Sequence, residues 1–327
     1  MRVFVFNYRM FDEDEYFRQY SKEFGMEIGF TEDSPSMDNM HLVDGYDAVS
    51  IITTKIDAVM MDAMKSYGIR VISTRTIGYD HIDLDHAKSI GMAVMHVTYD
   101  PTGVAEYTVM GILAAVRRLK EVLARTAVSD FTFEGLMSRQ LRNLTVGIIG
   151  AGSIGKAVMR DLSGFGCHII YSSRRRNVQA DEYGMFVPLD EILRTSDVVS
   201  LHLELNDDTR HIIDSDALQS MKDGALIVNT ARGPLIDTEA LIKSLESGHL
   251  GGAFIDVVEG EFGLYYNDCR GTDLSNHPIK VLGSMPNVIL THHMAFYYDA
   301  AIRDMVRNSL WGIFDILGGN ENEYRIA

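Results

Sequence analysis

The sequence predicts an α/β protein with two Rossmann-like domains, each built on a doubly wound parallel sheet. Three observations support this fold class. Short apolar runs alternate with helical segments along most of the chain, which is the order of parallel strands joined by crossover helices. The length of 327 residues exceeds what a single hydrophobic core usually holds. A glycine-rich turn at residues 150–155 (GAGSIG) follows one apolar run and opens a helix.

The first hundred residues predict a small α/β unit. Helical periodicity separates four strand-like runs, at residues 3–6, 46–52, 70–73 and 92–95. The pair Asp100-Pro101 then interrupts the pattern, because the residue before a proline avoids the helical region. Residues 104–120 follow as one long helix that is apolar over much of its surface, which predicts burial between domains or at a subunit interface.

From residue 144 onward the chain alternates regularly between strand and helix patterns. The apolar runs lie at residues 146–149, 169–171, 198–203, 226–228, 253–255 and 288–290, with a weaker run at 186–187. The last helix, 300–317, has no strand of its own to cover, so we expect it to return to the N-terminal unit. The predicted domains are therefore a discontinuous substrate domain, 1–99 plus 297–327, and a dinucleotide-binding domain, 100–296.

Composition and charge exclude several classes of partner. The formal net charge is −16 and the isoelectric point is about 5.0, so the protein should repel nucleic acids and anionic membranes. The N-terminus lacks an apolar stretch long enough for a signal peptide or a membrane span, which predicts a cytoplasmic protein. The two cysteines have no metal-ligand spacing, and we expect no metal.

The glycine turn predicts a dinucleotide site. Small residues at this spacing occur in many turns, but here a strand precedes them and a helix follows. The glycines then permit a tight turn and close approach of a pyrophosphate, with the helix N-terminus facing the anion. The residues predicted to bind the cofactor at this turn are Gly150, Gly152, Ser153, Ile154 and Gly155.

The end of the next strand bears on the choice between NAD and NADP. An acidic residue is expected there to hold the ribose hydroxyls of NAD, but the chain has Ser173, Arg174 and Arg175. Arginines beside a small hydroxyl residue can bind a 2′-phosphate, so NADP(H) is favoured. The alternative is that these arginines are only solvated charges in a surface turn. Glu204 could then accept the ribose hydroxyls of NAD(H).

Arg232, Glu261 and His293 each stand shortly after an apolar run that predicts a parallel strand. The carboxyl ends of such strands form the ligand crevice of an open α/β sheet, so the three side chains can meet there. Taken singly, each has an ordinary explanation: a helix-capping arginine, a solvated acid such as Glu259, and a packing histidine. Adjacent His292 and His293 rarely share one metal ion. Together, the three strand ends favour catalysis of keto acid reduction.

Four segments resemble the D-isomer-specific 2-hydroxyacid dehydrogenase family. They are the glycine turn, TARGPLID at 230–237, DVVEGE at 256–261 and THH at 291–293. The similarity covers essentially the whole chain and looks closest to the D-lactate dehydrogenase branch. The serine–arginine ending of the second strand is similar to the vancomycin-resistance type, and the His-His pair to the D-2-hydroxyisocaproate dehydrogenases. Which of these two groups is the better guide to the substrate stays open.

The resemblance implies a function for each of these positions. Arg232 would bind the carbonyl and carboxylate of the substrate, His293 would donate the proton, and Glu261 would be its charge partner. Further expected substrate-binding residues are Ile77, Gly78, Tyr99 and Phe296. Thr230 and Asp256 would contact the cofactor, Asp256 near the nicotinamide carboxamide. Many relatives have proline where this chain has His292.

The expected function is NAD(P)H-dependent reduction of a 2-keto acid, either pyruvate or a larger apolar one, to the D-2-hydroxy acid. The alternative is a non-catalytic, nicotinamide-sensing binding protein of the same fold. Such proteins typically carry extra tails for partners, and the chain stops soon after its last helix. The apolar helix 104–120 and the family resemblance also predict a homodimer.

Overall fold

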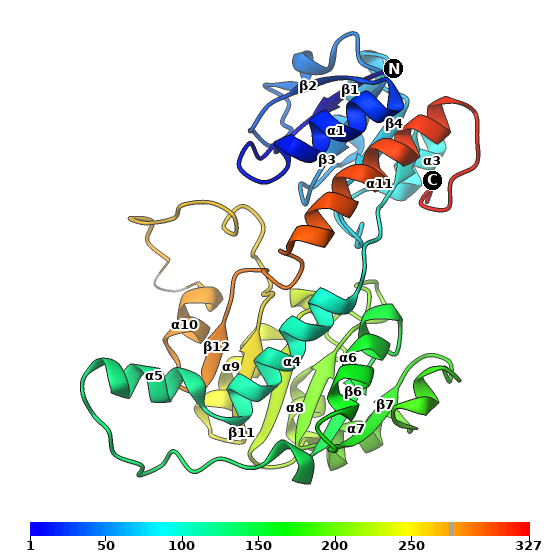
Figure 1. Cartoon of the computed structure of the whole chain (residues 1–327). Coiled ribbons are helices and arrows are strands. Elements are labelled where there is room, and N and C mark those ends of the chain that lie inside the picture. The colour runs from blue at the N-terminus through cyan, green and yellow to red at the C-terminus, as the bar shows by residue number, and fades with distance from the viewer. Residues whose placement is uncertain (275–276) are drawn as a thin grey trace. The chain divides into compact units, whose positions relative to one another are not determined.

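A computed structural model describes residues 1–274 and 277–327 of the chain (Figure 1). The chain forms two compact units: unit 1 comprises Met1–Asp100 and Tyr297–Ala327, and unit 2 comprises Pro101–Phe296. Each unit is a parallel sheet with helices packed on it, which confirms the predicted α/β fold with two parallel sheets. The functions assigned to the two units stay predictions.

Unit 1 contains a five-stranded sheet in the order β2-β1-β3-β4-β5, with every pair parallel. The strands are β1 (Arg2–Val5), β2 (Glu27–Phe30), β3 (Ala48–Ile51), β4 (Val71–Thr74) and β5 (Ala93–Met95). The strand β2 was not predicted, because this four-residue edge strand buries none of its side chains fully and so has no clear apolar pattern. The strand order reverses between β1 and β3, where open α/β sheets typically bind ligands.

Helices cover both faces of the unit 1 sheet. They are α1 (Asp14–Phe24), α2 (Ala58–Ser66), α3 (Leu84–Ile90) and α11 (Asp299–Leu317), with the short 3₁₀ helix η1 (Met40–Val43). Side chains alternate along β1, so Val3 and Val5 pack in one core with residues of α1 and α11, whereas Phe4 packs with α2 and α3. Although α11 is last in the sequence, it lies beside α1 (Figure 1).

Unit 2 contains a seven-stranded parallel sheet in the order β12-β11-β10-β9-β6-β7-β8. The strands are β6 (Thr145–Ile149), β7 (His168–Ser172), β8 (Met185–Phe186), β9 (Val198–Leu201), β10 (Ala225–Asn229), β11 (Leu250–Ile255) and β12 (Val288–Leu290). The direction of winding reverses between β6 and β9, and the glycine turn begins directly after β6. This arrangement places the predicted cofactor turn at the topological switch point.

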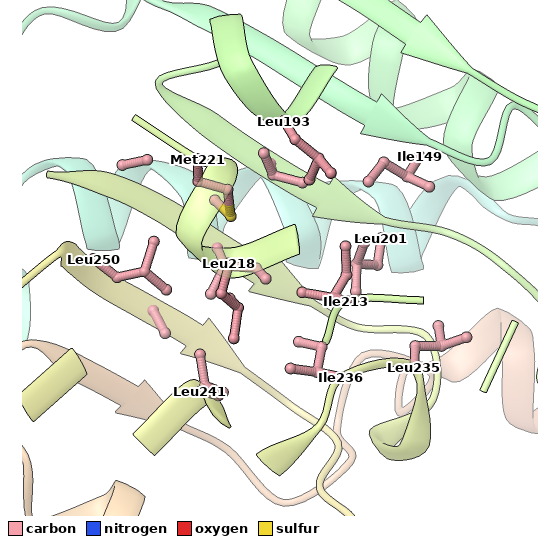
Figure 2. Packing of buried hydrophobic residues seen from close by; sticks show 14 of the residues in the cluster. Ile149, Leu193, Leu201, Ile213, Leu218, Met221, Leu235, Ile236, Leu241 and Leu250 are labelled. Atoms are coloured by element: carbon pink, nitrogen blue, oxygen red, sulfur yellow. The ribbon is translucent and has the colours of Figure 1, made fainter. Parts of the chain in front are cut away.

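Two apolar cores lie on opposite faces of the unit 2 sheet. The helices are α4 (Thr102–Val116), α5 (Leu119–Ala127), α6 (Ser153–Ser163), α7 (Leu189–Thr195), α8 (Ser215–Ser220), α9 (Thr238–Glu246) and α10 (Pro278–Ser284). Residues of α4 and α6 pack with Ile148 and Phe254 on one face. On the other face, Ile149 and Leu201 pack with the helices that follow β8 and β9 (Figure 2). Both cores support the strand ends that carry the candidate site.

The predicted helix 104–120 is wrong at its C-terminal end. The helix α4 ends at Val116, the backbone of Arg118 is left-handed with φ of 52°, and α5 starts at Leu119 in a new direction. The Nζ atom of Lys120 donates to the carbonyl oxygens of Gly283, Met285 and Val288 at 2.6–2.7 Å, which stabilises the break. Neither glycine nor proline marks this break, so the apolar pattern runs through it unchanged.

The predicted strand 198–203 is also too long, since β9 ends at Leu201. Its last residues turn away to pass the glycine turn, as the His202 carbonyl approaches Gly150. Among the described residues, no helix is long and apolar enough to cross a membrane.

Candidate active site

The predicted catalytic residues follow three neighbouring strands of unit 2. Arg232 comes after β10, Glu261 after β11 and His293 after β12, and these strands lie side by side in the sheet. Because the strands are parallel, their carboxyl ends meet at one edge. The structure therefore brings the segments that carry all three residues to the same edge of one sheet.

His293 and Glu261 form a direct pair. The Nδ1 atom of His293 donates to Oε1 of Glu261 at 2.7 Å. Glu261 is only 8% exposed, and its Oε2 accepts a hydrogen bond from the Val258 backbone at 2.8 Å. The carboxylate thus fixes the ring orientation and leaves Nε2 as the nitrogen that can exchange a proton.

The backbone of His293 is left-handed, with φ of 59°. This conformation costs about 1–3 kcal/mol for a residue other than glycine, so the surroundings must hold it. Asp256, fully buried, does part of this: its carbonyl oxygen accepts from the His293 N–H at 2.7 Å. Its carboxylate accepts from the Thr291 hydroxyl at 2.5 Å and from the N–H groups of Met294 and Ala295 at 2.9 and 3.0 Å.

Asp256 therefore has a structural function that no sequence pattern predicted. Both of its carboxylate oxygens are engaged by the segment that carries His293. Its predicted contact with the nicotinamide stays a prediction, and the observed bonds show that it orders the loop that carries His293.

The half-buried Arg232 lies in a turn that packs against the loop of Glu261. The side chain of Asn229 closes the turn by donating to the Arg232 carbonyl at 2.8 Å. A Cβ atom on Gly233 would lie 2.3 Å from the backbone carbon of Val258, so only glycine permits this contact. The preceding Thr230 hydroxyl contacts that of Thr108 in α4 at 2.8 Å.

The glycine turn has two glycines that the fold requires and one that it does not. Gly150 has φ of 98°, and a Cβ atom there would lie 2.2 Å from the His202 carbonyl oxygen. A Cβ atom on Gly155 would lie 1.9 Å from the Gly150 carbonyl oxygen. By contrast, a Cβ atom on Gly152 would meet no protein atom within 4 Å. Open space at Gly152, with Ser153 and Ile154 opening α6, fits a pyrophosphate group.

The loop after β7 presents two arginines to solvent. Arg174 and Arg175 are exposed, and in the described part of the chain their guanidinium groups have no hydrogen bond or ion pair. The Ser173 hydroxyl donates to the Arg175 carbonyl at 2.6 Å and so shapes the turn. Arg176 differs, because it pairs with Asp181 at 2.8 Å.

The other side of the glycine turn is formed by the residues after β9. Burial lowers the pKa of His202 to about 3, so this imidazole is neutral, and its Nε2 contacts the Ser200 hydroxyl at 2.9 Å. Glu204, the alternative ribose ligand, is exposed. Since β6 lies between β7 and β9, Ser173 and Glu204 follow the strands that flank the strand of the glycine turn on either side.

Three of the predicted substrate residues belong to unit 1. Ile77 and Gly78 lie in the loop after β4, where their carbonyl groups accept from His96 Nδ1 at 3.0 Å and from the Thr76 hydroxyl at 2.6 Å. In residues 1–274 and 277–327, neither backbone N–H donates to another backbone group. The ring of Tyr99 packs edge-on against Tyr298, with centroids 6.3 Å apart.

Phe296 and His292 differ in their relation to His293. The ring centroid of Phe296 lies 5.9 Å from that of His293, in an edge-to-face arrangement. His292 is exposed, and its ring packs edge-on against Tyr265 at 6.4 Å. Of these two histidines, His293 is the one that is hydrogen-bonded to Glu261.

The view of Glu259 as a solvated acid is wrong. Its carboxylate accepts from His211 Nε2 at 2.8 Å and from the Thr238 hydroxyl at 3.1 Å, which ties the loop of Glu261 to the start of α9. These partners lie 48 and 21 residues away in the sequence, so no local pattern could reveal them.

Two further groups were also missed. Arg75, directly before the loop of Ile77, is fully buried and pairs with buried Glu13 at 3.2 Å. Tyr265 and Tyr266 contact the segment 291–293, 26 and 27 residues later in the chain. The sequence feature that could have pointed to this contact is the pair of consecutive tyrosines in a polar loop.

In the described residues, no three His, Cys, Asp or Glu side chains form a group able to hold a metal ion.

Comparison with known proteins gives concordant matches. Residues 109–295 match the family model for the D-isomer specific 2-hydroxyacid dehydrogenase, NAD binding domain. A D-specific alpha-keto acid dehydrogenase of Enterococcus faecium is 40% identical over 313 residues, which are 95% of this chain and 96% of the relative. An aromatic 2-oxoacid reductase of Clostridium sporogenes is 37% identical over 317 residues, 95% and 96% of the two chains.

The fold matches solved structures over its full length. A D-lactate dehydrogenase of Treponema pallidum superposes with a TM-score of 0.88 at 32% identity, and the match covers 100% of both chains. The match includes both sheets and the strand ends that carry Arg232, Glu261 and His293. Sequence and structure together show that this chain belongs to the D-isomer-specific 2-hydroxyacid dehydrogenase family.

Proposed function

We propose that the protein reduces a 2-keto acid to the D-2-hydroxy acid with a nicotinamide cofactor. The observation that carries this proposal is the His293–Glu261 pair at the same sheet edge as Arg232. A protonated imidazole can donate to a developing alkoxide, and a guanidinium can bind a carboxylate. This combination suits a carbonyl group next to a carboxylate.

The glycine turn fits the pyrophosphate of the cofactor. The open space beside Gly152 and the N-terminus of α6 provide room and backbone donors for an anion. When bound, the cofactor supplies the hydride that reduces the carbonyl carbon.

The side chains of unit 2 supply the proton and the charge stabilisation. Arg232 binds the substrate through the parallel N–H donors of its guanidinium. His293 donates the proton on Nε2 to the carbonyl oxygen as negative charge develops there, while the Glu261 side chain holds Nδ1. In the oxidation direction, the neutral imidazole accepts the proton from the hydroxyl group.

In unit 1, the N–H groups of Ile77 and Gly78 are proposed to hold the substrate carboxylate. The supporting observations are that the Thr76 carbonyl accepts from the Val97 N–H at 3.1 Å and the Ile77 carbonyl accepts from His96 Nδ1 at 3.0 Å, which orients the two peptide planes that carry these N–H groups. Tyr99, whose hydroxyl-bearing ring packs on Tyr298, is proposed to contact the same carboxylate.

We propose NADPH as the preferred cofactor. Exposed Arg174 and Arg175 follow β7, and Ser173 stands where an acid would repel a 2′-phosphate. The matched family is described as NAD binding, so a preference for NADPH would be a property of this chain's own residues. Glu204 as ribose ligand, with NADH preferred, is the competing hypothesis.

We also propose a homodimer. The segment formed by α5 and residues 128–137, here called the arm, has no buried residue in α5 and exposes large apolar side chains. Their exposed fractions are 58% for Leu123, 73% for Phe131, 90% for Phe133 and 94% for Met137. Several large apolar side chains exposed along one segment are typical of a protein interface, and a second copy would cover them.

A substrate panel tests the proposed function. Pyruvate, 2-ketoisocaproate and phenylpyruvate are each assayed with NADH and NADPH, and the product is analysed by chiral chromatography. We expect turnover with at least one acid and only the D-product. Tight cofactor binding without turnover on any acid would instead support the nicotinamide-sensing protein.

A further inference from the structure

Two consecutive tyrosines contact the backbone of the segment that carries His293. The Tyr265 hydroxyl donates to the Thr291 carbonyl at 3.2 Å, and the Tyr266 hydroxyl donates to the His293 carbonyl at 3.3 Å. The Tyr266 ring also packs beside the His293 ring, with centroids 6.2 Å apart. Tyr266 is thus in contact with both the backbone and the imidazole of the proposed proton donor.

The tyrosines belong to the same turn as Glu261. The N–H groups of Leu264 and Tyr265 both donate to the Glu261 carbonyl at 3.0 Å, which forms one tight turn. This turn therefore holds His293 at two places: Glu261 holds Nδ1, and Tyr266 holds the carbonyl group. A shift of the turn would displace both contacts together.

The left-handed backbone of His293 needs these contacts. Its N–H donates to the Asp256 carbonyl, and its carbonyl accepts from Tyr266, so both polar backbone groups are fixed. Tyr266 itself is left-handed, with φ of 68°. His293 and Tyr266 are thus two left-handed residues, far apart in the sequence, that are hydrogen-bonded to each other. Strained backbone of this kind is typical of functional sites.

We propose that Tyr266 is a positioning residue that keeps His293 in its left-handed conformation and so aims Nε2 at the substrate oxygen. This inference rests on the proposed function, in which His293 donates the proton. The ring of Tyr266 also packs edge-on against Phe296 at 6.2 Å, so the three rings stabilise one another. Loss of the tyrosine lets the histidine relax toward common backbone conformations, in which the proton transfer geometry is poorer.

Two variants separate the hydroxyl from the ring. Tyr266→Phe removes the hydrogen bond and keeps the ring contacts, and we expect kcat to fall about 2–10-fold, the usual effect of one neutral hydrogen bond. Tyr266→Leu removes both, and we expect kcat to fall about 10–100-fold. The dissociation constant for NADPH, measured by fluorescence titration, should stay within twofold, because the cofactor turn lies elsewhere in the sheet.

Phe262→Leu is the matched control, since Phe262 lies on the same turn and is 56% exposed. We expect its kcat to equal that of the wild type. Wild-type kcat in Tyr266→Leu, or an equal loss in the Phe262 control, would overturn the positioning function. Weakened NADPH binding together with a lowered melting temperature in Tyr266→Leu would overturn it as well. Failure of the proposed function is distinguishable, because the wild type and all variants would then lack turnover.

Discussion

His293 and His292 are neighbours in the sequence, but their environments predict different effects of mutation. His293 is paired with a nearly buried carboxylate, whereas His292 is exposed and packs on a tyrosine ring. His293→Ala should lower kcat by about 10²–10⁴, the usual contribution of a positioned general acid. His292→Ala should change kcat by less than about threefold. Steady-state kinetics of both variants measure kcat, and an NADPH titration checks that the cofactor still binds. Equal losses of kcat in the two variants would refute His293 as the proton donor.

Arg232 is predicted to be intolerant of a change that preserves its charge. An ammonium group cannot reproduce the two parallel N–H donors that a carboxylate and a carbonyl accept. Loss of one charge-assisted hydrogen bond, worth about 1.5–3 kcal/mol, lowers kcat/KM of Arg232→Lys by about 10–100-fold. Arg139→Lys, at a surface ion pair with Asp197, serves as the control and should behave as wild type. Near-normal kcat/KM in Arg232→Lys would exclude the binding function.

Ser173 offers the clearest test of cofactor choice. Ser173→Asp should move the ratio of kcat/KM toward NADH, because a carboxylate repels the 2′-phosphate and accepts ribose hydroxyls. In the wild type we expect NADPH to be preferred about tenfold, since solvent weakens exposed charge pairs. Added salt should weaken NADPH binding more than NADH binding. A wild-type preference for NADH that Arg174→Ala leaves unchanged would favour Glu204 as the ribose ligand.

At the scale of elements, the turn between β6 and α6 separates a requirement of the fold from a requirement of binding. Gly152→Ala adds a Cβ atom that meets no protein atom within 4 Å, so the melting temperature should stay close to that of the wild type. Cofactor affinity should nevertheless fall about tenfold or more, because the methyl group would occupy the space proposed for the pyrophosphate. Gly150→Ala should lower the melting temperature, since its Cβ atom would collide with the His202 carbonyl. Thermal denaturation and cofactor titration of both variants are the measurements.

Several elements could be predicted from sequence patterns alone. The β6 strand, its glycine turn and the strands β9 to β12 could be predicted because buried parallel strands are continuous apolar runs. The break after α4 could not, because a lysine that binds three carbonyl groups across more than 160 residues stabilises it. The same holds for Tyr266 and Glu259, whose contacts with the site depend on loops that meet only in the folded chain.

For the molecule as a whole, the arm predicts a homodimer. Sedimentation equilibrium at micromolar concentration should give twice the chain mass of 36.6 kDa. Phe133→Asp should shift the protein toward the monomer, because burial of a charge at an apolar interface is costly. Val59→Asp, an exposed position on α2 of unit 1, should leave the dimer intact. A monomeric wild type would contradict the proposed dimer.

The return of α11 to unit 1 has a consequence for synthesis of the chain on the ribosome. The sheet of unit 1 is complete when β5 has emerged, but α11 starts about 200 residues later. At roughly 5–20 residues per second, translation of the intervening segment takes on the order of 10–40 s. Throughout that time the face of the nascent sheet that includes Val71 has α1 but lacks the part of its cover that α11 provides. Unit 2 is contiguous in the sequence, so it can finish folding before α11 has been synthesised. Unit 1 therefore starts to fold before unit 2 and completes its folding after it.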